Sequence, residues 1–145
     1  MIKYTFCCVL IAALLIGCTN DTLDASYDSM TDAIASGAVA KGWIPQWLPP
    51  EASDLKEVHN LDSNSSALAF EIPRGQVWAL PDHCRSVKLS DTAPSKFSRQ
   101  WWPSPKEISS SFYLYQCKAD ASPDFTFAAV HKSGRLGLHW RTYAP

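Results

Sequence analysis

Most of the short motifs that mark enzymes are missing from this chain of 145 residues. It has no Gly-x-Ser-x-Gly turn for a nucleophilic serine, no glycine-rich phosphate loop and no histidine pair with metal-binding spacing. Its cysteines include no Cys-x-x-Cys pair of the kind that zinc sites use. The sequence therefore predicts a non-catalytic protein without a metal site or cofactor.

Long apolar runs and an excess of charge of one sign are also missing. Tyr4 to Ile16 is a run of 13 uncharged residues, whereas a membrane-spanning helix needs about 20 apolar residues. Basic and acidic side chains number 13 and 14, so the basic surface typical of nucleic-acid binding is not expected. The chain shows no internal repeat, and its length is typical of one domain.

The uncharged run near the N-terminus begins after Lys3 and ends at a cysteine, in Leu15-Ile16-Gly17-Cys18. A charged start, a short apolar core and a small residue before a cut site are typical of a secretory signal peptide. The ending resembles the lipobox of bacterial lipoproteins, in which the cysteine is acylated and becomes the first residue. The resemblance implies a signal peptide over residues 1–17 and a lipid anchor on Cys18. The alternative is a plain buried cysteine in a hydrophobic helix.

The lipobox resemblance also implies a location in the cell envelope. Thr19 follows the cysteine, at the position where an aspartate favours retention in the inner membrane. The predicted location is therefore the periplasmic face of the outer membrane. One acyl chain binds membranes only reversibly, and three chains on Cys18 would make the attachment effectively permanent. Residues 18–27 are predicted to be the lipidated N-terminus and a flexible tether, followed by a single domain over residues 28–145.

Two of the five cysteines remain once the signal peptide and Cys18 are set aside. These are Cys84 and Cys117, and a remaining pair in an oxidising compartment usually forms a disulfide. The chain-entropy model gives roughly 3–4 kcal/mol for a closed loop of this size. His83 beside Cys84 suggests a metal site instead, but adjacent residues rarely bind one ion. A disulfide is the prediction.

The part of the chain after residue 27 combines one helical pattern with several strand patterns. Small and apolar residues recur with helical spacing over residues 29–41, behind a Ser29–Asp32 capping box and before Gly42. Alternating segments predict strands over residues 55–60, 67–72, 111–118, 124–131 and 135–143. The predicted fold is α+β, with an N-terminal helix packed on an antiparallel sheet of about five strands and one disulfide.

A Ser133-Gly134 turn sets the register of the last two predicted strands. Phe127 then lies opposite Trp140, on a face that is predicted to be buried. Ala128 lies opposite His139 on the other face, which we expect to be exposed because antiparallel sheets often have one solvated side. His139 is accordingly predicted to be a surface residue. His59, near the turn that precedes residues 67–72, is interpreted as part of a polar turn.

The segment after the predicted helix is rich in proline and tryptophan. It contains Gly-Trp-Ile-Pro at residues 42–45 and Leu-Pro-Pro at 48–50, and Asp-Ser-Asn follows at 62–64. Over residues 40–72 the chain resembles small bacterial lipoproteins of uncharacterised function, although Glu51 stands where a serine is expected. The resemblance implies no active-site residue. Trp43 and Trp47 are interpreted as core residues.

Residues 90–104 form an irregular stretch inside the loop between Cys84 and Cys117. Long irregular loops in compact domains are usually functional or disordered. Aromatic and arginine side chains of the kind found at binding hot spots occur in this stretch: Phe97, Arg99, Trp101 and Trp102. Two interpretations remain open, because the tryptophans could fold back as a lid on the core or form a contact surface for a partner.

The expected function is that of an envelope lipoprotein that binds another envelope protein through the aromatic loop or a sheet edge. In element order the chain resembles the small helix-then-sheet lipoproteins that assist outer-membrane protein assembly. The alternative is a periplasmic inhibitor of a glycan hydrolase such as lysozyme. The chain is similar to lysozyme-inhibitor lipoproteins in size and disulfide use, but those proteins are barrel-like, and a strong helix is not expected in them.

Overall fold

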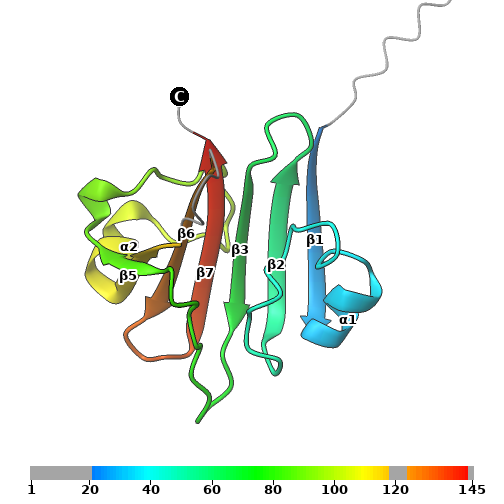
Figure 1. Ribbon diagram of the computed structural model, residues 1–145, viewed down its shortest axis with the longest axis horizontal. Coiled ribbons are helices and arrows are strands. Elements are labelled where there is room, and N and C mark those ends of the chain that lie inside the picture. The colour runs from blue at the N-terminus through cyan, green and yellow to red at the C-terminus, as the bar shows by residue number, and fades with distance from the viewer. Residues whose placement is uncertain (1–20, 118–123, 144–145) are drawn as a thin grey trace, which may run out of the picture.

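The computed structural model describes residues 21–117 and 124–143 of the chain. Seven strands form one antiparallel sheet in the spatial order β1-β2-β3-β7-β6-β5-β4 (Figure 1). The strands are β1 (Thr22–Ser29), β2 (Ser53–Asn60), β3 (Ser66–Glu71), β4 (Arg85–Val87), β5 (Phe112–Gln116), β6 (Asp124–His131) and β7 (Leu136–Tyr143). The short helices are α1 (Met30–Ala35), the 3-10 turn η1 (Leu89–Asp91) and α2 (Pro105–Ser111).

The α+β prediction, with an N-terminal helix packed on about five strands, is wrong. The sheet has seven strands, and the predicted helix over residues 29–41 is only six residues long. It begins as expected, because the Ser29 side chain accepts a hydrogen bond from the Asp32 amide. It ends early at Gly37, which has a φ of 81°. The amides of Gly37 and Ala38 then bond back to the carbonyls of Ile34 and Ala33, a closure that ends helices at a left-handed glycine.

The tether prediction is wrong for residues 22–27, which belong to β1. This strand pairs with β2 from Thr22 opposite Asn60 to Ser29 opposite Ser53. β1 is an edge strand with half-buried and exposed side chains. Because an edge strand is held largely by backbone hydrogen bonds, its sequence need not show a clear apolar alternation. Cys18 and the predicted signal peptide lie outside the described residues.

Both faces of the sheet are covered. We call residues 42–52 the strap, and the face beneath α1 and the strap the strap face. Its buried core includes Met30, Ala33, Ile44, Leu48, Leu55, Leu68 and Phe70. The opposite face lies beneath residues 89–111, and we call it the loop face. Its buried core includes Val58, Ala67, Ala69, Ile108, Phe127, Leu138 and Trp140.

The second covered face explains a further error in the sequence prediction. The register of β6 and β7 is confirmed, with Phe127 opposite Trp140 and Ala128 opposite His139. His139 is nevertheless only 6% exposed, with its ring edge-on to Trp47 of the strap at 5.4 Å. The prediction that His139 is a surface residue is therefore wrong. Burial lowers the pKa of His139 to about 3, and the nearby charge of Arg141 contributes.

The Cys84–Cys117 disulfide is present. Cys84 lies just before β4 and Cys117 lies just after β5. The pairing of these two strands begins beside the disulfide, with Arg85 opposite Gln116. β4 has only three residues, so the disulfide fixes the last and shortest strand of the sheet to its neighbour. The chain between the two cysteines includes the irregular residues 92–104 that cover the loop face.

Candidate binding cleft on the loop face

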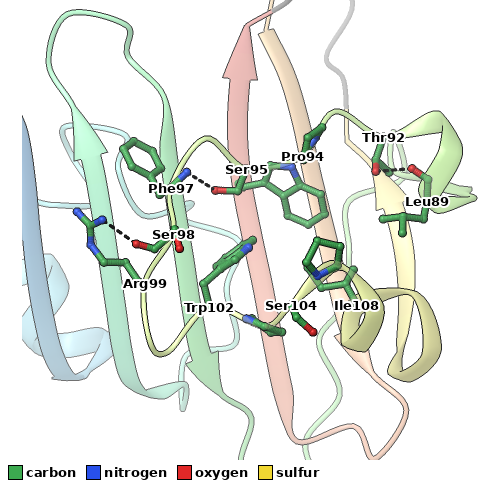
Figure 2. Close-up of a pocket in the computed structure, with 13 residues that line it drawn as sticks. Leu89, Thr92, Pro94, Ser95, Phe97, Ser98, Arg99, Trp102, Ser104 and Ile108 are labelled. Atoms are coloured by element: carbon green, nitrogen blue, oxygen red, sulfur yellow. Dashed lines mark hydrogen bonds between the residues drawn. The ribbon is translucent and has the colours of Figure 1, made fainter.

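A cleft of about 440 Å³ opens between the irregular residues 92–104 and the loop face. We call it the aromatic cleft. Leu89 of η1, Ile108 of α2 and Trp140 of β7 line it from the core side. The irregular segment contributes Thr92, Pro94, Ser95, Phe97, Ser98, Arg99, Trp102, Pro103 and Ser104, and α2 adds Pro105 (Figure 2). The volume is within the range of about 300–1,000 Å³ that is typical of small-ligand sites.

Trp140 holds the irregular segment against the sheet. Its indole nitrogen donates a hydrogen bond to the carbonyl of Ala93 at 2.8 Å. Its ring lies edge-on to Trp102, with centroids 5.8 Å apart, and stacks on Phe127 of the adjacent strand at 5.2 Å. Edge-on and offset-stacked pairs are the favoured arrangements of aromatic rings. The segment is thus attached to the core through one buried tryptophan.

Arg99 attaches the same segment to the edge of the sheet. Its Nε and a terminal nitrogen donate to the two carboxylate oxygens of Asp24 on β1, at 2.7 and 2.9 Å. These hydrogen bonds lower the pKa of Asp24 and raise that of Arg99. The side chains are 30% and 53% exposed, so solvent limits the pair to about 1 kcal/mol or less. The Arg99 charge is therefore already paired within the chain.

The structure places three of the four predicted contact residues in the aromatic cleft: Phe97, Arg99 and Trp102. Trp101 does not line it, but packs edge-on to Trp102 with centroids 6.1 Å apart. Both tryptophans are half-buried against the core of the loop face. This packing agrees with the lid interpretation, and a contact role stays a prediction.

Sequence reasoning missed the core side of the cleft. The sequence patterns do not single out Ile108, and they place Trp140 only on a buried sheet face. The missing information was that the irregular segment covers this same face. The contact between the irregular segment and the loop face joins residues far apart in the chain, such as Trp140 and Ala93, which are 47 positions apart. Local sequence patterns cannot predict contacts of this kind.

The polar groups of the aromatic cleft are largely engaged within the chain. The Thr92 hydroxyl donates to the Leu89 carbonyl at 2.8 Å. Ser95 Oγ accepts from the Phe97 amide, and Ser104 Oγ accepts from the Glu107 amide at the start of α2. Apart from Ser98 and the paired Arg99, the remaining lining side chains are aromatic, aliphatic or proline, so the cleft suits apolar groups. Within residues 21–117 and 124–143, no cluster of histidine, cysteine or acidic side chains could hold a metal ion.

A second pocket, of about 470 Å³, lies on the strap face beside β1 and β2. We call it the strap-face pocket. It is lined by Leu23, Tyr27, Ser36, Ala38, Lys41, Trp43, His59 and Leu61. Trp43 of the strap stacks on the His59 ring at 4.0 Å, and His59 Nδ1 lies 2.9 Å from a carboxyl oxygen of Glu57. Glu57 itself is only 1% exposed.

Burial is the largest cause of the pKa shifts of Glu57 and His59. It raises the pKa of Glu57 to about 8, with a contribution from the Asp24 charge and an opposing one from Arg141. It lowers the pKa of His59, as do the positive charges of Lys41 and Arg141. The sequence interpretation of His59 as a polar turn residue missed this pair. Residues 55, 57 and 59 alternate along β2, so Glu57 and His59 lie on the same face of the sheet as the buried Leu55. This alternation is the sequence signal that could have placed the pair on a covered face.

The comparisons with known proteins cover only the first part of the domain. A family model described as the YbbD head domain matches residues 21–71, about a third of the chain. Comparison with curated proteins and with solved structures finds no match. None of the helices in the described residues is long and apolar enough to cross a membrane. The chain is thus similar over β1, α1, β2 and β3 to a bacterial envelope-related family, and all the lining residues of the aromatic cleft lie beyond the match.

Proposed function

We propose that this protein is a non-catalytic lipoprotein of the bacterial envelope that binds another envelope protein through the aromatic cleft. The sequence around Cys18 supports the lipid anchor, since it resembles a lipobox behind a signal peptide. The similarity of residues 21–71 to an envelope-related family supports the same compartment. In this proposal the anchored protein faces the periplasm from the outer membrane.

A lipid on Cys18 would keep the domain close to the membrane. β1 begins at Thr22, four positions after Cys18. Because an extended chain spans at most about 3.3–3.6 Å per residue, the start of the sheet would lie within roughly 14 Å of the lipidated cysteine. This short reach favours partners that are themselves in or beside the membrane.

The observation that carries the binding proposal is the mainly apolar lining of an open cleft whose polar groups are largely engaged within the chain. Such a surface offers little to a charged or strongly hydrogen-bonding ligand. It suits one or two apolar side chains of a protein segment, because aromatic pockets of this kind commonly hold the anchoring residues of a protein interface. Phe97 and Trp102 are the side chains that we expect to contact the partner.

Filling the cleft should abolish partner capture without unfolding the protein. Ser98 lines the cleft and is exposed, so Ser98→Trp should occupy it. Ser109 is also exposed, on α2 and outside the lining, so Ser109→Trp is the matched control. After chemical crosslinking in intact envelopes and purification, we expect wild type and Ser109→Trp to recover the same envelope protein and Ser98→Trp to lose it.

Two other results of the same capture would change the proposal. Equal recovery by both tryptophan variants would show that the cleft is not the contact surface. Recovery of a soluble glycan hydrolase as the main crosslinked protein would favour the inhibitor interpretation instead. Thermal melts of both variants check that the comparison is made between folded proteins.

A further inference from the structure

The strap-face pocket is lined by a histidine, His59, whose ring is held in place by the buried Glu57 and by Trp43. The His59 side chain is 10% exposed and that of Glu57 is 1% exposed. Both carboxyl oxygens of Glu57 lie close to His59 Nδ1, at 2.9 and 3.1 Å, and Trp43 stacks on the ring. With Nδ1 occupied, Nε2 is the ring atom that remains for a ligand in the pocket that His59 lines.

The protonation of Glu57 determines what this nitrogen offers. Because burial keeps the carboxyl protonated at neutral pH, its O–H donates to Nδ1, and the neutral imidazole then carries its proton on Nε2. The pocket therefore receives an N–H donor from His59. Lys41 adds a cationic donor, and its ammonium group has no hydrogen bond or ion pair within the described part of the chain. The Ser36 hydroxyl already donates to the Ala33 carbonyl.

We propose that the strap-face pocket binds a carboxylate attached to a small apolar group, with the carboxylate on Lys41 and His59. One ammonium group and one neutral N–H match the two oxygens and single charge of a carboxylate. Leu23, Tyr27 and Leu61 line the same pocket and supply apolar surface for the rest of the ligand. The carboxylate could come from a free organic acid or from the C-terminal residue of a peptide.

This site is independent of the partner surface proposed above. The strap-face pocket and the aromatic cleft share no lining residue, and they lie on opposite faces of the sheet. Loss of one function should therefore leave the other intact. A failed test of carboxylate binding has no bearing on the capture experiment with Ser98→Trp, and the reverse is also true.

Carboxylate binding can be tested by NMR titration of the full ¹⁵N-labelled chain. The ligands are isovalerate as a free acid, N-acetyl-leucine as a model of a peptide C-terminus, and N-acetyl-leucinamide as its neutral analogue. We expect at least one acid to shift the signals of Lys41, Trp43 and His59. The amide should bind about tenfold more weakly, because it loses a charge-assisted hydrogen bond. Binding of isovalerate alone identifies a free acid as the source, and binding of N-acetyl-leucine alone identifies a peptide end.

A matched pair of lysine variants separates a site from general charge attraction. Lys41→Gln should weaken binding of the acid about tenfold. Lys56→Gln, which removes the same charge from a lysine outside both pockets and paired with Asp54, should bind as the wild type does. Equal affinity for acid and amide, an equal loss in both variants, or the absence of shifts at Lys41, Trp43 and His59 with either acid would overturn the proposal.

Discussion

Replacing Trp140 with alanine is expected to lower the free energy of unfolding by about 3–5 kcal/mol, the usual cost of truncating a buried tryptophan. Trp140 is 2% exposed and contacts both Phe127 in the sheet and Trp102 in the irregular segment. The substitution removes these ring contacts and leaves the Ala93 carbonyl without its indole donor. The irregular segment should therefore loosen, and the aromatic cleft should lose its core side.

Urea unfolding of Trp140→Ala and Trp140→Phe measures this role. Phenylalanine keeps a ring between Phe127 and Trp102 but cannot donate to the Ala93 carbonyl, so it should lose mainly one hydrogen bond, about 1 kcal/mol, and some packing. Hydrogen exchange at residues 92–104 should be faster in the alanine variant than in the phenylalanine variant. If the alanine variant is no less stable than the phenylalanine variant, the irregular segment is not held by this ring.

Replacing Glu57 with glutamine is expected to change how stability depends on pH. The pKa of Glu57 is about 8 in the folded protein, against an ordinary value of 4.5. Between these values the folded protein holds a proton that the unfolded chain releases. The free energy of unfolding contributed by this group therefore falls as pH rises, by up to about 1.4 kcal/mol for each pH unit. The glutamine variant, which does not titrate, should lack this decline.

The buried histidines change the free energy of unfolding with pH in the opposite direction to Glu57. They therefore set the lower end of the pH range in which the effect of Glu57 can be measured. The pKa values of His59 and His139 are lowered by burial, so the unfolded chain takes up protons below about pH 6.5 that the folded protein does not. Their contribution to stability is lost as pH falls below that value. Wild type should therefore be most stable near pH 6.5 and become less stable towards pH 8, and the decline above pH 6.5 belongs to Glu57.

Chemical denaturation at pH 6.5, 7.2 and 8 tests the Glu57 prediction. Glu71→Gln is the control, because Glu71 is an exposed carboxylate on the neighbouring strand β3. The control should show the same decline as wild type, whereas the stability of Glu57→Gln should not fall over this range. A wild-type protein with constant stability from pH 6.5 to 8 would mean that Glu57 does not keep its proton in the fold.

Local sequence patterns predicted the elements whose determinants are close together in the chain. The β2–β3 hairpin and the β6–β7 register follow from alternation and turn residues, and the disulfide follows from counting the cysteines left once the predicted signal peptide and Cys18 are set aside. The start of α1 at Ser29 follows from its capping residues. Its end at Gly37 was missed because the small residues that follow keep helical spacing while the backbone turns away.

The errors concern features that depend on contacts distant in sequence. β1 has a weak apolar pattern and becomes a strand because β2 supplies its backbone partners. His139 and the Glu57–His59 pair look like residues of a solvated face until the strap covers them. For the aromatic cleft, the composition of the irregular segment indicated only part of the candidate site, namely Phe97 and Trp102. Only the fold showed that Trp140 and Ile108 complete the aromatic cleft.

Site-specific photo-crosslinking in intact envelopes tests the central claim, that the aromatic cleft binds an envelope protein, most directly. A photoreactive amino acid is placed at Ser98 in the cleft or, as the control, at Ser109 on the exposed side of α2. We predict one discrete crosslinked envelope protein from position 98 and none from position 109. Irradiation that yields no adduct from position 98, or the same adduct from both positions, would contradict the claim.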